Sequence, residues 1–456
     1  MRLVLLAAVK NIAPFLLVLA IFFGASDAFS QLTAGPMLGH VGLRSAKVWL
    51  QTEGSATVEL SYWAVDGSGS ESPTEARFTS RPVISDLDFD GSATVELAGL
   101  EPGTTYNYQV LVNGAVASGP DPLTLSTQPL WAYRTDPPEL TLALGSCAYI
   151  NETAYDRPGK PYGGGYEIFD AIADVQPDAM LWLGDNVYFR EVDLEARSGM
   201  VHRYSHARRL PEMKRLLMAC PQYATWDDHD FGPNDADRSY VLGDDARKVF
   251  NAFWANPSSG IPQLGEWGGI STAFTIGDVD VFMLDNRTFR INHNVLTGDS
   301  QVLGDDQINW LIAALRSSRA PFKLICLGGQ MVSDCAVYEN MAQFGAERDG
   351  ILRRIKAENI HGVVFLTGDR HGSELSRVEF SRGHAALDFT CSPLTSRAYD
   401  NSEEPNSFRV EDTSVGERNF GTLTISGPRK ERVMTIRCHD TKGRALWEHS
   451  YAAKDL

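Results

Sequence analysis

The hydrophobic periodicity of this 456-residue chain changes once, near residue 139, and this change limits the fold more than any other feature. Before it, short segments alternate apolar and polar residues between Gly, Ser and Pro clusters, as antiparallel sandwiches do. After it, apolar runs alternate with segments of helical period, which is typical of layered α/β proteins. Strands are predicted over residues 46–50, 57–60, 106–110, 142–144, 179–183, 279–284, 322–327, 363–367, 422–425, 433–437 and 445–449, and helices over 166–175, 244–254, 305–317 and 347–358. The chain is therefore predicted to join a small all-β domain to a larger α/β domain.

The predicted domain boundaries follow the same change. A β-sandwich of the fibronectin type III-like or immunoglobulin-like kind is expected over residues 29–128, because residues 100–106 resemble the corner of fibronectin type III domains, with Tyr106 in the corner position. Adjacent prolines near the end of residues 129–138 indicate a linker. The larger domain is then expected over residues 139–456.

The first 28 residues have the pattern of a signal peptide. Arg2 and Lys10 are basic, residues 12–24 are almost wholly apolar, and the small residues before position 29 predict cleavage after Ala28. Lys10 and Pro14 interrupt the apolar run, which leaves it shorter than the ~20 residues that a membrane span needs. We therefore expect an exported protein, periplasmic or extracellular, with no membrane span in the mature chain.

The charge balance limits the classes of partner. Lys and Arg number 41 against 58 Asp and Glu, a net charge of -17, so nucleic-acid binding by a basic surface is not expected. An acidic protein can still act on an anionic substrate if a bound cation dominates the local field. The 6 cysteines are too sparse for a disulfide scaffold, and their pairing cannot be deduced from the sequence.

Polar residues with metal-binding side chains follow three of the predicted strands, 142–144, 179–183 and 363–367, and the apolar run at residues 223–226. In α/β sheets, ligand sites gather at the carboxyl ends of the strands. Each cluster alone has a structural explanation, such as a packed cysteine, a helix-capping aspartate or a solvated acidic loop. Their coincidence in one domain instead favours a metal site. The clusters are Gly145-Ser146-Cys147, Gly184-Asp185-Asn186-Val187-Tyr188, Asp227-Asp228-His229-Asp230 and Gly368-Asp369-Arg370-His371.

The side-chain types in these clusters suit two different ions. A thiolate, a phenolate and an imidazole are donors for a transition metal such as ferric iron, whereas carboxylate and amide oxygens suit calcium or magnesium. A carboxylate between the two groups can bridge both ions. Two ions about 3.5–4 Å apart can activate a hydroxide for an in-line phosphoryl displacement.

In combination, the four clusters and the segment Leu284-Asp285-Asn286-Arg287 resemble the PhoD-like alkaline phosphatases. The resemblance extends over nearly the whole mature chain. That family belongs to the metallophosphoesterase superfamily, so the resemblance implies a four-layer αββα sandwich after the β-domain. It also implies Fe3+ and Ca2+, with one or two calcium ions, as cofactors.

The resemblance also implies a role for each site residue. Cys147, Tyr188 and His371 would hold iron, Asp185 would bridge the ions, and Asp228 and Asp369 would face calcium. His229 would lie beside the phosphate, where an imidazole can stabilise the phosphoryl oxygens or protonate the leaving alkoxide. Arg287 and Asn234 are further candidates for phosphate contact, and for both a structural hydrogen bond is an equally open interpretation.

The function expected from these residues is a secreted, metal-dependent phosphoesterase that hydrolyses phosphomonoesters, phosphodiesters or both by attack of a metal-activated hydroxide. A monomer is expected. One alternative is a purple acid phosphatase-like enzyme, but that family would show Gly-Asn-His-Glu and Gly-His-x-His where this chain has residues 227–230 and 368–371. Another is a non-catalytic secreted binding protein with a degenerate phosphatase domain, which would lack ligands, yet each proposed position carries a donor.

Overall fold

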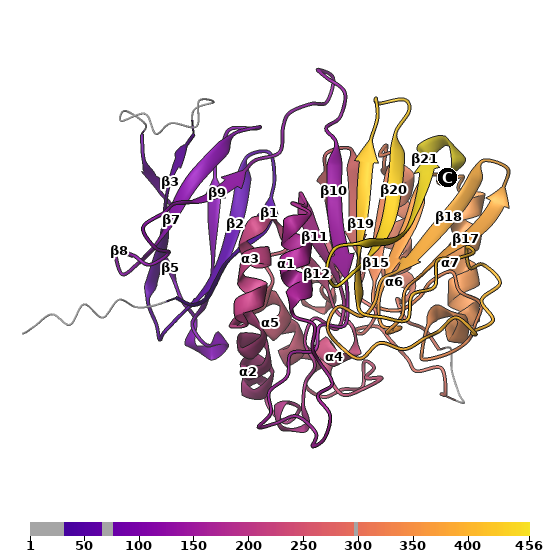
Figure 1. Ribbon diagram of the computed structural model, residues 1–456, viewed down its shortest axis with the longest axis horizontal. Helices are drawn as coiled ribbons and strands as arrows, with labels where there is room; N and C mark the ends of the chain where they lie inside the picture. The colour runs from indigo at the N-terminus through magenta and orange to yellow at the C-terminus, as the bar shows by residue number, and fades with distance from the viewer. Residues whose placement is uncertain (1–31, 66–75, 296–299) are drawn as a thin grey trace, which may run out of the picture.

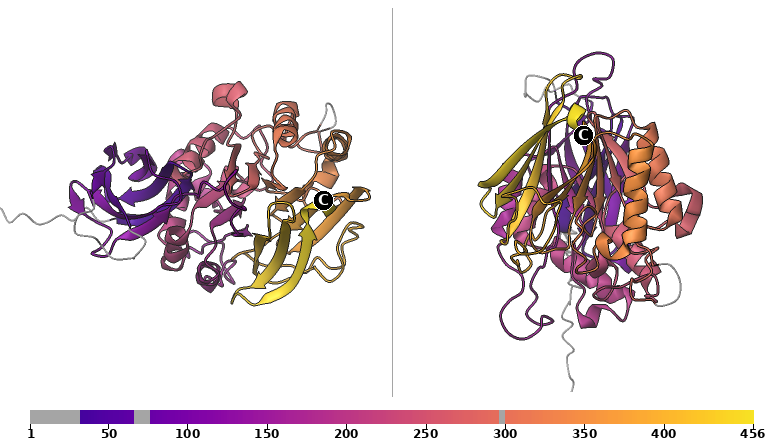
Figure 2. Two further views of the ribbon diagram at one scale, coloured as in Figure 1. Left: turned by 90° about the horizontal axis from the view of Figure 1, so that it is seen from above. Right: turned by 90° about the vertical axis from the view of Figure 1, so that its right-hand side faces the viewer.

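The structure is a computed structural model that describes residues 32–65, 76–295 and 300–456. The predicted signal peptide, residues 1–28, lies outside the described residues. The N-terminal β region and the α/β region lie side by side along the long axis of the molecule (Figure 1, Figure 2). Within the described residues, no helix combines the length and apolar character that crossing a bilayer would require.

The N-terminal region forms two antiparallel sheets packed face to face. One contains β1 (Leu32–Val41), β2 (Ser45–Thr52) and β6 (Ser92–Ala98). The other contains β3 (Thr57–Ala64), β4 (Phe78–Thr79), β5 (Val83–Ile84), β7 (Thr105–Val112), β8 (Ala115–Val116) and β9 (Leu123–Ser126). Val48 and Val95 from the first sheet meet Leu60 and Tyr108 from the second in one buried cluster. The backbone N–H of Glu101 donates to the Tyr106 hydroxyl at 2.8 Å, which is the hydrogen bond of a tyrosine corner.

The α/β region contains two six-stranded mixed sheets. The first has the order β12 (Gln222–Thr225), β11 (Ala179–Leu183), β10 (Leu140–Gly145), β19 (Asn419–Ser426), β20 (Val433–Asp440) and β21 (Ala445–Ala452). The second has the order β13 (Thr272–Ile276), β14 (Val279–Met283), β15 (Phe322–Leu327), β16 (Val363–Thr367), β18 (His384–Thr390) and β17 (Glu374–Ser381). Strands β10, β11 and β12 are parallel to one another, as are β14, β15, β16 and β18.

Helices cover the outer face of each sheet. The inner faces bury Leu142 and Leu181 of the first sheet against Val281 and Leu324 of the second. One outer face is covered by α1 (Glu167–Asp174), α2 (Arg197–Arg208), α3 (Pro211–Ala219) and α5 (Gly243–Phe253). The other is covered by α6 (Asp305–Ser317) and α7 (Gly345–Ala357). The predicted four-layer αββα sandwich is therefore confirmed.

The sequence predicted the most apolar elements best. The bounds of β11, β15, β16 and α6 are as predicted. Helix α2 was missed, because it buries Arg203 and Arg208 and so lacks a clean apolar stripe. Arg203 donates to Asp193 at 2.8 Å, and the Arg208 guanidinium lies 3.9 Å from the centroid of the Trp254 ring. Strands β13, β17 and β18 and helix α3 were also missed. The six cysteines, all within the described residues, are free and buried.

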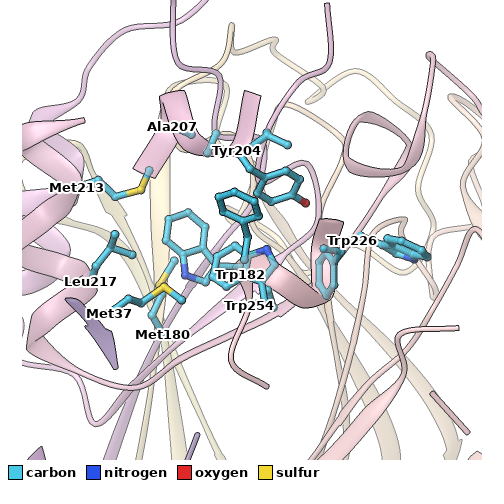
Figure 3. Close-up of a cluster of buried hydrophobic side chains, with 14 of the residues drawn as sticks. Met37, Met180, Trp182, Tyr204, Ala207, Met213, Leu217, Trp226 and Trp254 are labelled. Atoms are coloured by element: carbon cyan, nitrogen blue, oxygen red, sulfur yellow. The ribbon is translucent and has the colours of Figure 1, made fainter. Parts of the chain in front are cut away.

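One buried cluster joins the β region to the α/β region. Met37 of β1 lies with Met180, Met213 and Leu217 in this cluster, and Trp182, Tyr204 and Trp254 continue it (Figure 3). Trp49 of β2 belongs to the same cluster, and its indole N–H is shared between Ser92 Oγ at 2.7 Å and the Ala252 carbonyl at 2.8 Å. The two regions therefore share a continuous apolar core and form one packed unit.

Candidate metal centre

The proposed ligands lie in loops that follow parallel strands of both sheets. Cys147 follows β10, Asp185 follows β11, and Asp228 begins α4 (Asp228–Phe231) just after β12. Asp369 and His371 follow β16 in the opposite sheet. Since parallel strands end at the same edge of a sheet, the stacked sheets bring these loops together. All six metal-ligating residues proposed from the sequence meet at this edge.

A thiol, a carboxylate, a phenol and an imidazole form one half of the site. Ligand atoms of Cys147, Asp185 and His371 lie within 4.8 Å of one another. The Cys147 thiol is 3.5 Å from Asp185 Oδ2. The Tyr188 hydroxyl lies 3.1 Å from Asp185 Oδ2 and 3.2 Å from His371 Nε2. This half has the mixed S, O and N donors expected for a transition metal.

Hydrogen bonds orient the donors of this half. His371 Nδ1 lies 2.6 Å from the Arg397 carbonyl, which can only accept, so Nδ1 carries the proton and the Nε2 lone pair faces the site. The Ser392 hydroxyl donates to Cys147 Sγ at 3.1 Å. Strand-end patterns could not reveal the Ser392 contact, because Ser392 lies 245 residues after Cys147 in the sequence.

Carboxylates form the other half of the site. Asp227, Asp228 and Asp369 place oxygen atoms within 4.8 Å of one another, and oxygen atoms of Asp185 and Asp228 lie equally close to a ring nitrogen of His229. Asp185 thus belongs to both halves, which is the position that a bridging ligand needs. Asp228 Oδ2 accepts the backbone N–H of Asp235 at 2.8 Å.

The backbone is held in the left-handed region at four of the proposed ligands. The φ angles are 60° at Cys147, 52° at Asp185, 69° at Asp369 and 54° at His371. Such conformations cost non-glycine residues about 1 kcal/mol or more and occur often at functional sites, where the surrounding structure fixes them. The turns therefore direct these side chains into the site rather than along the strands.

Two glycines allow the loops to approach closely. A Cβ on Gly184, whose φ is 92°, would lie 2.8 Å from Cβ of Asp227. A Cβ on Gly328 would lie 2.3 Å from Cγ of Asp227 and 2.5 Å from Nδ2 of Asn286. Only glycine leaves room for Asp227 at both positions.

The electrostatics of the site fit bound cations. Burial, together with the neighbouring carboxylates, raises the pKa of Asp185 well above its ordinary value, and burial likewise raises the pKa of Asp227 and Asp369. Burial also raises the pKa of the Cys147 thiol to about 12. Cations would stabilise the ionised forms of all these groups.

Several buried oxygens at the site lack hydrogen-bond partners. They are Oδ2 of Asp227, Oδ1 of Asp228 and Oδ1 of Asn286. An unpaired buried oxygen is costly unless it is bonded to another group. Carboxylate and amide oxygens are the ligands that a hard cation such as calcium prefers, so the donor set present here fits such an ion.

His229 lies between the site and a cavity of about 790 Å³. Its ring centroid is 4.2 Å from that of Tyr188, and its Nε2 is 3.9 Å from Asp228 Oδ2. The side chain is 23% exposed, so a group in the cavity can reach it. Burial lowers the pKa of His229, which favours the neutral imidazole.

Arg287 and Asn234 differ in their access to substrate. Asn234 is exposed and lines the cavity beside His229. The Arg287 guanidinium is fully buried and is already paired with Asp227 and with Glu339. A phosphate contact by Arg287 would require these pairs to break, whereas one by Asn234 would not. Both roles remain predictions.

Glu339 was missed by the sequence analysis. Its buried carboxylate pairs with Arg287 and with Arg290 at 2.9 Å, and together with Asp228 and Asp235 it forms a further group of acidic ligand atoms within 4.8 Å. It lies in the long loop between β15 and η4 (Met341–Phe344) and does not directly follow a strand. No local pattern marks it, and its proximity to the site depends on the path of that loop.

Comparison with known proteins agrees with this geometry. A model of the PhoD-like phosphatase family matches residues 142–425, and a model described as a domain of unknown function (DUF7800) matches residues 29–128. "Alkaline phosphatase D" of Bacillus subtilis (strain 168) is 24% identical over 332 residues, which is 63% of this chain and 54% of that protein. The match therefore spans about half of that relative's length.

A solved structure has the same fold over most of its length. The structure titled "Structure of PhoD" superposes with a TM-score of 0.72 at 18% identity and covers 93% of this chain and 91% of that chain. At this identity the superposition establishes the fold alone. The family match covers most of the α/β region and includes each of the strand-end clusters described above. The chain belongs to the PhoD-like phosphatase family.

Proposed function

We propose that this protein is a metal-dependent phosphoric ester hydrolase of the alkaline phosphatase D type. The observation that carries the proposal is the position of Asp185, whose carboxylate lies between a thiol-imidazole group and a carboxylate group. A mixed donor set of this kind suits two unlike ions sharing one bridging ligand. The named relative, alkaline phosphatase D, supports the reaction class.

In this proposal the two halves of the site hold different ions. Cys147, Tyr188 and His371 would hold ferric iron, Asp228 and Asp369 would hold one or two calcium ions, and Asp185 would bridge. When bound, such ions lower the pKa of water and neutralise charge on the phosphoryl oxygens.

The chain's own residues would position the substrate and move a proton. The net reaction forms a bond from a water oxygen to phosphorus, breaks the bond from phosphorus to the ester oxygen, and transfers one proton to the leaving oxygen. His229, which lines the cavity beside the proposed metal site, would donate the N–H of its neutral imidazole to a phosphoryl oxygen, or would give a proton to the leaving oxygen when its ring is protonated. Asn234 would donate its amide N–H to the phosphoryl group.

Arg287 would act through another residue. Its buried pairs with Asp227 and Glu339 hold Asp227 beside Asp228 and Asp369. We therefore infer a positioning role for Arg287 rather than direct contact with substrate.

We also propose that the protein is exported to the periplasm or the cell exterior. The basic residues, apolar run and small residues before position 29 support this. N-terminal sequencing of the protein recovered outside the cytoplasm should start at Phe29, and a protein found only in the cytoplasm with Met1 intact would contradict export.

The activity is tested by initial rates on a chromogenic phosphomonoester and its matching diester at alkaline pH, with and without a calcium chelator. We expect activity that the chelator removes and added calcium restores. Metal analysis should find iron in the wild type and in Cys220→Ala, which removes a buried thiol at the end of α3, but not in Cys147→Ala. A folded, metal-loaded protein that hydrolyses neither ester would overturn the proposal.

A further inference from the structure

The cavity beside His229 extends well beyond the space that a phosphoryl group needs. Its volume is about 790 Å³, and its lining includes Tyr188 and His229, which adjoin the proposed metal site, and the exposed Asn234. Much of the remaining lining comes from the segment 149–162, which follows β10. Small-molecule sites are commonly concave cavities of this size with a few convergent polar groups.

Aromatic rings form one wall of the cavity. Tyr149, Tyr155 and Tyr162 all line it. The rings of Tyr149 and Tyr162 meet edge to face with centroids 4.9 Å apart. The centroids of the Tyr149 and Tyr188 rings are 5.1 Å apart. Tyr155 is 43% exposed and so offers ring surface to a ligand. Such a wall favours a planar group, because aromatic rings attract one another in edge-to-face and offset-stacked geometry.

The charge of the lining differs in sign from that of the whole chain. Its two carboxylates are neutralised, since Asp156 pairs with Arg190 and Glu191 pairs with Arg157, both at 2.7 Å. The other two cations, Lys160 and Arg397, form no ion pair with any residue in the described ranges.

Arg397 is already oriented over this wall. Its guanidinium carbon lies 5.2 Å from the centroid of the Tyr162 ring. In a chain of net charge -17, two unpaired cations beside an aromatic wall make a local site for an anion attached to a ring.

The wall is held in place before any ligand binds. Tyr149 Oη donates to Asp156 Oδ1 at 2.9 Å, and Arg190 donates to Asp156 and to the Ile150 carbonyl at 2.7 Å. The Arg190 guanidinium also lies 3.9 Å from the centroid of the Tyr149 ring. Because these contacts hold Tyr149 and Asp156, this part of the wall needs little ordering on binding.

We infer that this cavity is a leaving-group subsite for a planar aromatic group that carries a second negative charge. The inference rests on the proposed phosphoesterase function, because it assigns the leaving group to the side on which His229 meets the cavity. The ring lies against Tyr149, Tyr155 and Tyr162, and its anionic substituent lies near Lys160 and Arg397. The favoured substrates are phosphate esters of such groups.

The test compares two esters of similar shape, 3-carboxyphenyl phosphate, whose ring substituent is anionic, and 3-carbamoylphenyl phosphate, whose ring substituent is uncharged. We expect wild type to prefer the carboxylate in kcat/KM, mainly through KM. In the double variant Lys160→Gln/Arg397→Gln this preference should fall about fivefold, since each exposed ion pair contributes up to about a factor of five. The preference should also fall on raising the salt concentration. Lys430→Gln, an exposed cation in the β19–β20 turn, is the matched control and should keep the preference.

A second arm tests the aromatic wall. Tyr155→Leu should raise KM for both aryl esters about threefold, and Tyr155→Phe, which keeps the ring, should not. Equal preference for the two esters in wild type and in the double variant, with normal turnover, would overturn the subsite and leave the proposed function intact.

A binding measurement separates the subsite from catalysis. Titration of 3-hydroxybenzoate and 3-hydroxybenzamide, followed by ligand-observed NMR, should show tighter binding of the anion to wild type and loss of that difference in the double variant. If the metal-loaded protein hydrolyses neither ester but keeps this binding difference, the subsite stands and the proposed function fails. If the anion binds no better than the amide, the subsite fails.

Discussion

The two regions of the molecule bury very different groups. The interior of the β region is a cluster of aliphatic and aromatic side chains such as Val48, Leu60 and Val95. The α/β region has comparable apolar layers but also buries Asp185, Asp227 and Asp228 at the ends of its strands. Asp227 is paired with Arg287, but Asp185 has no ion-pair partner among the described residues. Burying such a carboxylate without a cation opposes folding, whereas burying aliphatic groups drives it. The comparison indicates that stability is concentrated in the apolar clusters and chemistry at the strand ends.

The largest expected effect is at the bridging position. Asp185→Asn should lower kcat/KM at least about a thousandfold, because a two-ion centre contributes several kcal/mol of transition-state stabilisation. The metal-free variant should unfold at the same or a higher temperature than the metal-free wild type, because the substitution removes a buried carboxylate that faces Asp228. Steady-state kinetics, metal analysis and thermal unfolding measure these effects.

A fully active Asp185→Asn protein with a normal metal content would contradict the bridging role. A large loss of stability in the metal-free variant would contradict the view that the apolar clusters stabilise the fold and the buried carboxylates do not.

The opposite result, a loss of stability without a loss of activity, is expected for a substitution in the apolar core that joins the two regions. Trp49→Ala should lower the free energy of unfolding by about 3–5 kcal/mol, through the cavity it leaves and the lost indole hydrogen bonds to Ser92 and Ala252. Activity per folded molecule should stay within about twofold of wild type, as expected for a site with no contact to Trp49. Denaturant unfolding and active-site-normalised rates check both statements, with Trp49→Phe as the milder control. A loss of activity per folded molecule would show that the site depends on the core that joins the two regions.

A smaller effect is expected for a substitution that impairs the chemical step but leaves metal binding intact. His229→Ala should lower kcat about a hundredfold, the lower end of the usual contribution of acid-base catalysis. Its iron and calcium content should match wild type, because the proposed metal-holding set does not include His229. Normal kcat would exclude His229 from the chemical step, and loss of metal would make it a ligand.

The smallest effect concerns pH at the boundary between the regions. Burial lowers the pKa of His40 from 6.5 to about 4, and its Nδ1 lies 3.2 Å from the Tyr223 hydroxyl. The native state therefore binds a proton less readily than the unfolded state between these values. The His40 contribution should be complete above about pH 6.5 and should fall by about 3 kcal/mol as the pH drops towards 4.

The measurement is the free energy of unfolding of wild type and His40→Gln at pH 7.5, 5.5 and 4.5. The variant should lose less stability on acidification than wild type. Parallel pH curves for the two proteins would show that His40 is not the titrating group at this boundary.

Local sequence patterns were sufficient for the apolar elements and for the ligands that follow them. Strand β16 and the cluster from Asp369 to His371 could be predicted together, because the end of an apolar run marks a strand end. Helix α2 could not, because its buried Arg203 is stabilised by Asp193 and by Glu152 from elsewhere in the chain. From the sequence alone, a charged residue is expected at the surface, because charged side chains are rarely buried without a partner.

The sequence by itself therefore determined the layered fold and which donors stand at the strand ends, because periodicity and turn position are local properties. Only the tertiary structure decided that Glu339 neutralises Arg287, that Ser392 donates to Cys147, and that Lys160 and Arg397 face the same cavity. These contacts join segments far apart in the chain. They depend on how the two sheets stack and how long loops return across their edge, and no local pattern encodes that path.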